Sequence, residues 1–272
     1  MINITREYLN QMNASADDKL LMLDYIKGDT VLDVGVGGGV VGQLIKSKLP
    51  HLNVVGIEKS FKSYAAPQFV PYNHIIKADA RNLHDVVDVG EVDTVIFSSV
   101  LHEVYSYNGY DTNEIYKALE SAYSILPDGG RIIIRDGVKM EDNSHVVIKF
   151  KDPRDVTKVE KFVQDFEARS IQCTVVADGC VEMLMNDAME FLYTYTWGDD
   201  AYEREVKEQY GVFTPKEYIQ FIRHRLGMNL VTHNHYLQEG HNYYLSKKVE
   251  LFDEEGRRTR FPDSNLLLVF QK

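Results

Sequence analysis

The first half of the chain alternates short apolar runs with amphipathic segments. Five apolar runs have the length and composition of strands and lie at 30–34, 53–57, 74–77, 94–97 and 131–135. Segments with helical periodicity lie before or between them, at 16–26, 41–48, 61–66 and 112–126. Strands that alternate with helices are typical of βαβ units, in which the strands are parallel. The pattern therefore predicts an α/β fold with a mostly parallel sheet.

The alternation of strand-like and helical segments changes over 139–211 and then resumes. The changed region contains strand-like runs and a charged helical segment, at 145–150, 172–176 and 155–167. The alternation continues with a helix and two strands, at 214–226, 229–236 and 265–270. We therefore expect one doubly wound domain with an inserted cap. Its parts are a core over 1–138, an α+β cap over 139–211, and the completion of the core over 212–272 with a polar insertion at 237–262.

An aromatic stretch, EFLYTYTWG, lies inside the predicted cap. Phe191, Tyr193, Tyr195 and Trp197 occupy alternate positions, which share one face of a strand but spread around a helix. These side chains form either the core of the cap itself or an aromatic wall over a flat or cationic acceptor. The sequence leaves both interpretations open.

Composition limits the compartments and partners. Hydrophobic residues make up 44% of the 272 residues, which is ample for a buried core. The formal net charge of −11 argues against broad nucleic-acid binding, which depends on Lys and Arg. Two cysteines cannot form a disulfide framework, no apolar run approaches the ~18 residues of a membrane span, and the first residues lack the apolar region of a secretory signal. A soluble, cytoplasmic protein without a membrane anchor is expected.

The strongest chemical signal is the segment VLDVGVGGG at 31–39. An apolar strand ends in Asp33 and leads into Gly35, Gly37 and Gly39, after which a helix begins. Glycines let the backbone turn sharply and approach a ligand closely, and a helix N-terminus offers unpaired N–H groups. A ligand is therefore expected at the carboxyl edge of the sheet.

Acidic residues follow the next two strands. Glu58 lies ~20 residues beyond the loop, where a carboxylate that binds ribose hydroxyls is expected. Asp79, in the segment KADARNL, can accept a hydrogen bond from the amino group of an adenine. The literal G-x-G-x-x-G pattern that ends at Gly42 also allows a dinucleotide such as NAD. The acid after the second strand does not exclude this ligand, because a dinucleotide also binds its ribose through such a carboxylate.

Together these motifs resemble the class I S-adenosylmethionine-dependent methyltransferases, in particular members with a small-molecule or ubiquinone-biosynthesis type of fourth strand. The matching segments are VLDVGVGGG, GIEKS, KADARNL, VIFSSVLHEV and LPDGGRIIIRD. The resemblance implies a seven-stranded Rossmann-like sheet whose last strand, at 265–270, is antiparallel. It also implies S-adenosylmethionine as cofactor and S-adenosylhomocysteine as product. The cofactor-binding residues that it implies are Asp33, Gly35, Gly37, Gly39, Glu58, Lys59, Asp79, Ala80 and Ser98.

Four residues are candidates for the chemistry: His102, Glu103 and Tyr107 after the fourth strand, and Arg135 at the end of the fifth. A sulfonium methyl group is already a good electrophile, so the protein must align the acceptor and exclude water. A histidine with a near-neutral pKa suits proton removal from an alcohol, phenol or ammonium group. Arg135 either binds an acidic substrate group or pairs with Asp136.

The segment after the fourth strand reads SSVLHEV, so the N/D-P-P-Y/F element of base-N-methylating enzymes is absent there. The expected function is therefore methyl transfer to a small molecule or metabolite. Three alternatives stay open: an RNA or nucleotide-derived substrate, a NAD-type oxidoreductase, and a module that binds the cofactor without catalysis. No metal is expected, because the histidines lack HExxH or paired-cysteine spacing. The sequence does not define the oligomeric state.

Overall fold

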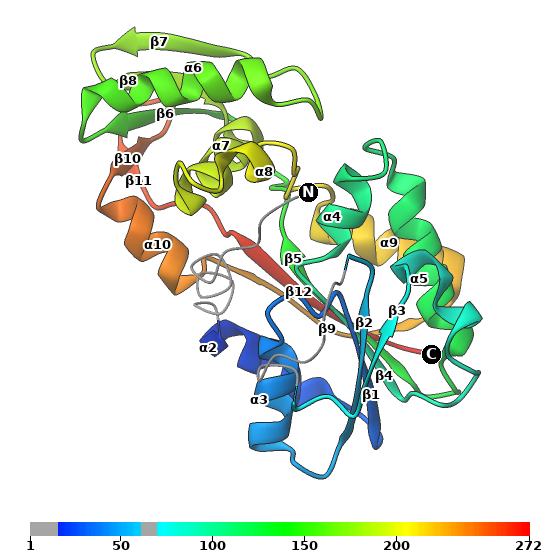
Figure 1. The fold of residues 1–272 in the computed structure, drawn as a ribbon. Helices are drawn as coiled ribbons and strands as arrows, with labels where there is room; N and C mark the ends of the chain where they lie inside the picture. Colours follow the sequence, from blue (N-terminus) through cyan, green and yellow to red (C-terminus); the bar gives the residue numbers. More distant parts are fainter. Residues whose placement is uncertain (1–15, 61–69) are drawn as a thin grey trace. The chain divides into compact units, whose positions relative to one another are not determined.

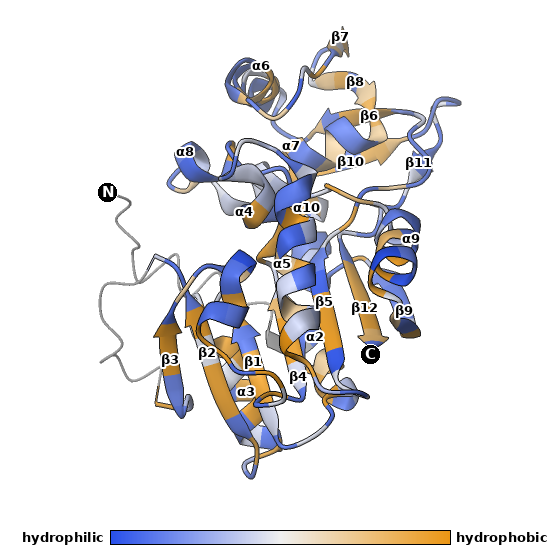
Figure 2. Cartoon of the chain, turned by 90° about the vertical axis from the view of Figure 1, so that its right-hand side faces the viewer, coloured by the Kyte–Doolittle hydropathy of each residue, from blue (hydrophilic) through white to orange (hydrophobic). Residues whose placement is uncertain are grey.

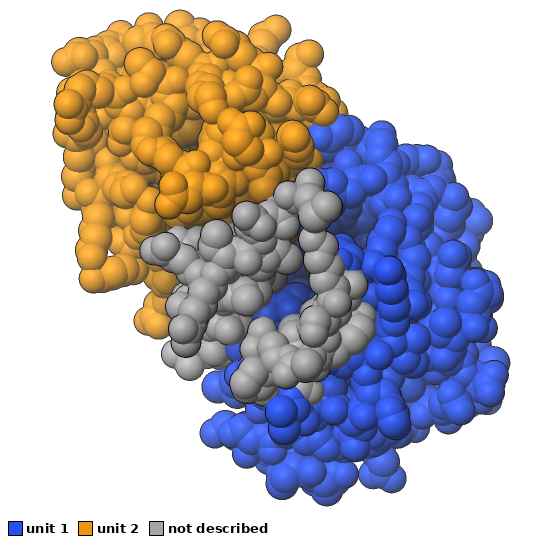
Figure 3. All heavy atoms as spheres, viewed as in Figure 1, with its two compact units in different colours: residues 1–136, 215–234, 266–272 blue, residues 137–214, 235–265 orange. Residues whose placement is uncertain are grey.

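The computed structural model describes residues 16–60 and 70–272, which fold into two compact units (Figures 1 and 3). Unit 1 comprises Met1–Asp136, Pro215–Asn234 and Leu266–Lys272, and unit 2 comprises Gly137–Thr214 and His235–Asn265. Each unit is therefore assembled from separate stretches of the chain. The helix expected at 61–66 lies outside the described residues.

Unit 1 is built on a seven-stranded sheet with the strand order β3-β2-β1-β4-β5-β12-β9. Neighbouring strands from β3 to β5 are parallel, and the sheet is mixed because its last strand is antiparallel. The expected α/β fold is confirmed. The strands are β1 Thr30–Val34, β2 Asn53–Glu58, β3 His74–Lys77, β4 Thr94–Ser98, β5 Arg131–Gly137, β9 Asn229–Tyr236 and β12 Asn265–Gln271.

Helices cover both faces of this sheet, with α2 and α3 on one face and α5 and α9 on the other (Figure 1). Central strands covered on both faces read as continuous apolar runs, and the strands of unit 1 are mostly orange in Figure 2. In α5, Ile115, Leu119 and Ala122 are fully buried at helical spacing. The helical segments are α2 Ala16–Lys19, η1 Leu20–Tyr25, α3 Val40–Lys48, η3 Ala80–Asp85, α4 Leu101–Ser106, α5 Thr112–Ile125 and α9 Pro215–Leu226.

Unit 2 has an antiparallel five-stranded sheet with the order β11-β10-β6-β8-β7. Its strands are β6 His145–Phe150, β7 Cys173–Ala177, β8 Cys180–Leu184, β10 Val249–Phe252 and β11 Arg258–Thr259. Its helical segments are η4 Pro153–Asp155, α6 Val156–Asp165, α7 Met185–Trp197, α8 Tyr202–Glu205 and α10 Glu239–Ser246. The segment at 237–262 therefore contains α10, β10 and β11, and β10 pairs with β6.

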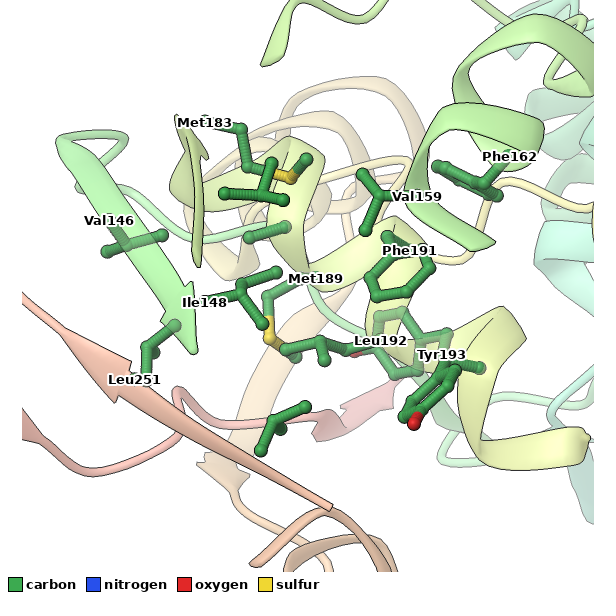
Figure 4. Close-up of a cluster of buried hydrophobic side chains, with 14 of the residues drawn as sticks. Val146, Ile148, Val159, Phe162, Met183, Met189, Phe191, Leu192, Tyr193 and Leu251 are labelled. Carbon is green, nitrogen blue, oxygen red and sulfur yellow. The ribbon is translucent and has the colours of Figure 1, made fainter. Parts of the chain in front are cut away.

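The aromatic stretch of unit 2 forms the helix α7. Every residue from Asp187 to Tyr195 is buried, and a helix that is surrounded on all sides does not show a one-faced apolar stripe. Figure 4 shows Phe191 and Tyr193 of this helix within the cluster that also contains Ile148 and Phe162. Of the two interpretations left open above, the packing within unit 2 therefore favours the cap core.

Candidate active site

The glycine loop leaves the carboxyl end of β1 in a conformation that requires glycine. Gly35, Gly37 and Gly39 have φ angles of 78°, 49° and 78°, in the left-handed region that side chains disfavour. A Cβ atom on Gly35 would lie 2.6 Å from Cγ2 of Val100. The N–H of Gly35 donates to the carbonyl of Ile57 at 2.8 Å, which ties the loop to β2. The loop is therefore held close to the sheet edge by its own backbone.

Glu58, the last residue of β2, also holds the loop. Its Oε2 accepts the N–H of Gly37 at 3.2 Å, and its Oε1 accepts the N–H of Ser60 at 2.9 Å. An ionised carboxylate has about four acceptor positions, so two of them remain for a ligand. The spacing of ~20 residues noted in the sequence corresponds to a direct contact between the acid and the loop.

Asp79 lies after β3 and caps η3 by accepting the N–H of Arg81 at 3.0 Å. The Lys59 ammonium group lies 2.8 Å from Asp79 Oδ2, and the Arg81 guanidinium group binds the same carboxylate. These contacts, with that of Arg81 the largest, hold the pKa of Asp79 well below its usual range. Asp79 is therefore an ionised acceptor at neutral pH. Lys59 contacts it, and the neighbouring Ala80 is buried.

Two buried polar atoms in the central strands have no hydrogen-bond partner in the described part of the chain. They are Oδ1 of Asp33 in β1 and Oγ of Ser98 in β4. Asp33 pairs with Ile96, so Ser98, two residues further on, lies on the same face of the sheet. Buried polar groups are nearly always hydrogen-bonded, so these atoms mark a place where a ligand with hydrogen-bond donors would fit.

Burial raises the pKa of Asp33 to about 7, opposed by the hydrogen bond from Tyr72 and the charge of Lys19. The folded protein therefore keeps this proton at pH values at which an unfolded Asp, with a pKa near 4, has lost it. We expect the free energy of unfolding to fall, relative to that of Asp33→Asn, as pH rises from about 4 to about 7. Urea denaturation of both proteins across this range tests it. A difference between the two proteins that does not change with pH would contradict the expectation.

His102 in α4 contacts a carboxylate from the neighbouring strand. Its Nδ1 lies 2.5 Å from Oδ1 of Asp136, and Asp136 Oδ2 accepts the backbone N–H groups of Leu101 at 2.9 Å and of His102 at 3.2 Å. Both side chains are buried. A carboxylate only accepts hydrogen bonds, so the proton in this contact belongs to Nδ1, and Nε2 is the basic nitrogen of the neutral ring. Asp136 thus caps α4 and fixes the imidazole in one tautomer.

The other catalytic candidates have different surroundings. Arg135 is buried, and its guanidinium group donates to Asp18 Oδ2 at 2.8 Å and to Ser99 Oγ at 2.5 Å. The acid that pairs with Arg135 in unit 1 is therefore Asp18, whereas Asp136 contacts His102. Glu103 lies in the first turn of α4, and Tyr107 follows its last turn with 46% of its surface exposed. Sequence reasoning missed Asp136 as the partner of His102, although His102 follows β4 and Asp136 lies at the end of β5, at the same sheet edge.

A family model described as a methyltransferase domain matches residues 32–134, which include the glycine loop, both strand-end acids and His102. Residues 32–134 therefore form a methyltransferase domain of the S-adenosylmethionine-dependent type. The expected family and the expected cofactor are thus confirmed. None of the helices in residues 16–60 and 70–272 has both the length and the hydrophobicity needed to cross a membrane.

The chain is 25% identical over 130 residues to (iso)eugenol O-methyltransferase of Clarkia breweri, a match that covers 48% of this chain and 30% of that protein. It is 24% identical over 139 residues to ribosomal RNA large subunit methyltransferase G of Aeromonas salmonicida, covering 49% and 36%. The matches span about a third of the length of these curated relatives. An O-methyltransferase family 2 protein from Planctomyces limnophilus, solved with apigenin, superposes with a TM-score of 0.50 at 13% identity, covering 98% of this chain and 62% of that protein.

The residues at this sheet edge fit S-adenosylmethionine. S-adenosylmethionine carries an ammonium group, a sulfonium group, two ribose hydroxyls and an adenine amino group, all of which are cationic or donate hydrogen bonds. The sheet edge offers three carboxylates, from Asp33, Glu58 and Asp79, and the unpartnered oxygens of Asp33 and Ser98. The protein therefore offers hydrogen-bond acceptors and carboxylates to the donors and positive charges of the cofactor.

Proposed function

We propose that this protein transfers the methyl group of S-adenosylmethionine to a small molecule that has a hydroxyl or amino group, with His102 as general base. The cofactor supplies an electrophilic methyl group on its sulfonium sulfur. The protein supplies alignment, exclusion of water and a place for the acceptor's proton. The contact between His102 and Asp136 carries the proposal, because it gives the chain an oriented base directly after β4. In the sheet, β4 is the neighbour of β1, the strand that leads into the glycine loop.

In this proposal, the residues of the sheet edge divide the cofactor between them. Gly35 and Gly37 approach the methionine part, Glu58 accepts from the ribose hydroxyls, and Asp79 and Ala80 address the adenine. Asp33, Gly39, Lys59 and Ser98 complete the set, Lys59 through its ion pair with Asp79. The hydrogen bond between Glu58 and Gly37 supports this division, because a ligand held by Glu58 then also lies against the loop.

His102 removes the acceptor's proton with Nε2, while Asp136 stabilises the imidazolium ion that forms. A histidine suits this role because its unperturbed pKa lies near neutral pH. A neighbouring carboxylate that accepts from Nδ1–H holds the ring in one orientation. Glu103 and Tyr107, in and after the same helix, are proposed to contact the acceptor. Arg135 is proposed to act through its contact with Ser99, which directly follows β4.

The substrate class is proposed from the chemistry of the relatives and the charge of the chain. One relative is named for O-methylation of (iso)eugenol, and a structural neighbour was solved with apigenin. Both compounds are phenols, whose proton a histidine can remove. The ribosomal RNA relative favours RNA as a second candidate. The net charge of −11 opposes it, because phosphate binding depends on Lys and Arg.

Two measurements on the purified chain test the proposed function. Isothermal titration with S-adenosylhomocysteine should give saturable binding. Incubation with methyl-labelled S-adenosylmethionine and either isoeugenol, a cell metabolite extract or total RNA should place label in a small-molecule fraction. Label found only in RNA would support the second candidate. Binding without transfer to any fraction would contradict catalysis, and absence of binding would overturn the proposal as a whole.

A further inference from the structure

A buried tyrosine packs beneath the glycine loop. Tyr72 lies just before β3 and is only 7% exposed. A Cβ atom on Gly42 of α3 would lie 2.4 Å from the ring carbon Cζ, and one on Gly56 of β2 would lie 3.1 Å from Cδ1. These two glycines therefore leave the space that the ring fills between α3 and the sheet. Gly42 completes the literal dinucleotide pattern of the sequence, and this packing gives it a different physical reason.

The Tyr72 hydroxyl makes two hydrogen bonds that join elements on either side of the loop. It donates to Oδ2 of Asp33 at 2.5 Å, and it accepts the N–H of Gly42 at 3.1 Å. Gly42 is the third residue of α3, whose N-cap residue is Gly39. An N-cap side chain normally accepts such an N–H, but Gly39 has none. The hydroxyl of Tyr72 therefore replaces the missing cap of α3 and ties it to the end of β1.

We propose that Tyr72 is a positioning residue of the cofactor site, which fixes both ends of the glycine loop and the direction of the Asp33 carboxylate. This inference rests on the proposed function. Because Oδ2 of Asp33 is bound by the hydroxyl, Oδ1 is the oxygen directed to a ligand, and it has no partner in the described ranges. A cationic ligand needs this carboxylate ionised, and a donor hydroxyl favours the ionised form.

The groups that influence Asp33 are Lys19 from α2, Glu58 from β2, and Tyr72 from the segment before β3. Lys19 and Tyr72 favour the ionised carboxylate, whereas burial and Glu58 oppose it. Loss of the hydroxyl therefore removes one of two favourable influences. It should move the ionisation of Asp33 to higher pH and, with it, the pH at which a cationic cofactor binds tightly.

Tyr72→Phe removes the hydroxyl and keeps the ring. We expect its Kd for S-adenosylhomocysteine to rise about tenfold at pH 7. The deficit should shrink toward pH 9, where Asp33 is ionised in both proteins. Titration calorimetry from pH 6 to pH 9 measures this. A purely structural role would lower the melting temperature of the variant without shifting the pH profile of binding.

Two further variants keep the test decisive. Tyr123→Phe removes a hydroxyl from α5, where the ring lies under Lys272, and its binding should equal that of the wild type. Asp33→Asn keeps the Tyr72 ring and its bond to Gly42, and its binding should be independent of pH between 6 and 8. In the Asp33→Asn background, Tyr72→Phe should change Kd by less than about twofold, because the two residues act as a pair.

The inference is overturned if Tyr72→Phe binds like the wild type at every pH, or if it weakens binding equally with and without Asp33. If Tyr72→Phe does not fold, a pH-dependent Kd in Asp33→Asn equal to that of the wild type overturns it. If the wild-type protein binds no S-adenosylhomocysteine, the proposed function itself is wrong. If the wild type binds and Tyr72→Phe binds equally well, only the inference about Tyr72 is wrong.

Discussion

Exchanging Asp136 for asparagine is expected to lower kcat by about 10²–10⁴-fold while the Kd for S-adenosylhomocysteine changes by less than about twofold. The amide oxygen can still accept the N–H groups of Leu101 and His102, so α4 keeps its cap. The amide nitrogen then faces Nδ1 of His102 and donates to it, which moves the ring proton to Nε2. The base is then blocked in an intact fold. His102→Ala should lose turnover to a similar degree.

The measurement is a labelled methyl-transfer assay on the best acceptor, paired with calorimetry for the cofactor. Glu120→Gln is the matched control, because it removes a carboxylate of α5 that pairs only with the exposed Arg225 in the described ion pairs. Its turnover should be unchanged. If Asp136→Asn and His102→Ala both keep wild-type kcat, the acceptor needs no base from this pair. If both lose cofactor affinity as strongly as turnover, the pair is part of the cofactor site instead.

Replacing Gly35 with alanine is expected to weaken S-adenosylhomocysteine binding at least tenfold, which corresponds to about 1.4 kcal/mol. The new Cβ lies 2.6 Å from Val100 Cγ2, and φ of 78° is unfavourable for any side chain. Either the loop or the side chain of Val100 must therefore shift. Gly37→Val should have a similar effect, because φ at Gly37 is also positive and valine is β-branched.

Gly90→Ala is a matched control for this prediction. Gly90 has φ of 84°, close to that of Gly35, but no atom lies within 4 Å of the position of its Cβ. Both variants carry the same backbone strain, and only Gly35→Ala disturbs the loop. Calorimetry and thermal unfolding are compared for the two proteins. Equal loss of affinity in both variants, or none in Gly35→Ala, would show that the geometry of the loop does not govern binding.

The parallel strands of unit 1 and the residues at their ends were accessible from the sequence for a physical reason. A strand covered on both faces must be apolar throughout, so β1, β4 and β5 appear as short continuous runs. In a parallel sheet, all carboxyl ends meet at one edge, and β1, β2 and β3 are neighbours in the sheet, so Asp33, Glu58 and Asp79 lie at the same edge. The glycine loop adds a backbone requirement that few residues other than glycine can meet.

Other parts depend on contacts between distant residues, which local patterns do not encode. The aromatic helix α7 is surrounded by its own unit, so it lacks the one-faced periodicity that reveals a helix. The pairing of β10 with β6 joins Val249 to Phe150, about a hundred residues earlier. The sequence around Tyr72 contains no pattern that predicts the hydrogen bonds of its hydroxyl with Asp33 and with the N-terminus of α3. The contact of His102 with Asp136 likewise joins α4 to β5, which are 34 residues apart at these positions.

The strand order of unit 1 has a consequence for how the chain folds. β12, at Asn265–Gln271, lies between β5 and β9 in the sheet, yet β5 ends at Gly137, more than a hundred residues earlier. While the chain is being synthesised, the edge of β5 that does not pair with β4 keeps its backbone N–H and C=O groups without their final partner until β12 leaves the ribosome. Sheets closed by such remote pairings form slowly. The nascent protein is therefore at its most vulnerable to aggregation during the interval in which unit 2 is being translated.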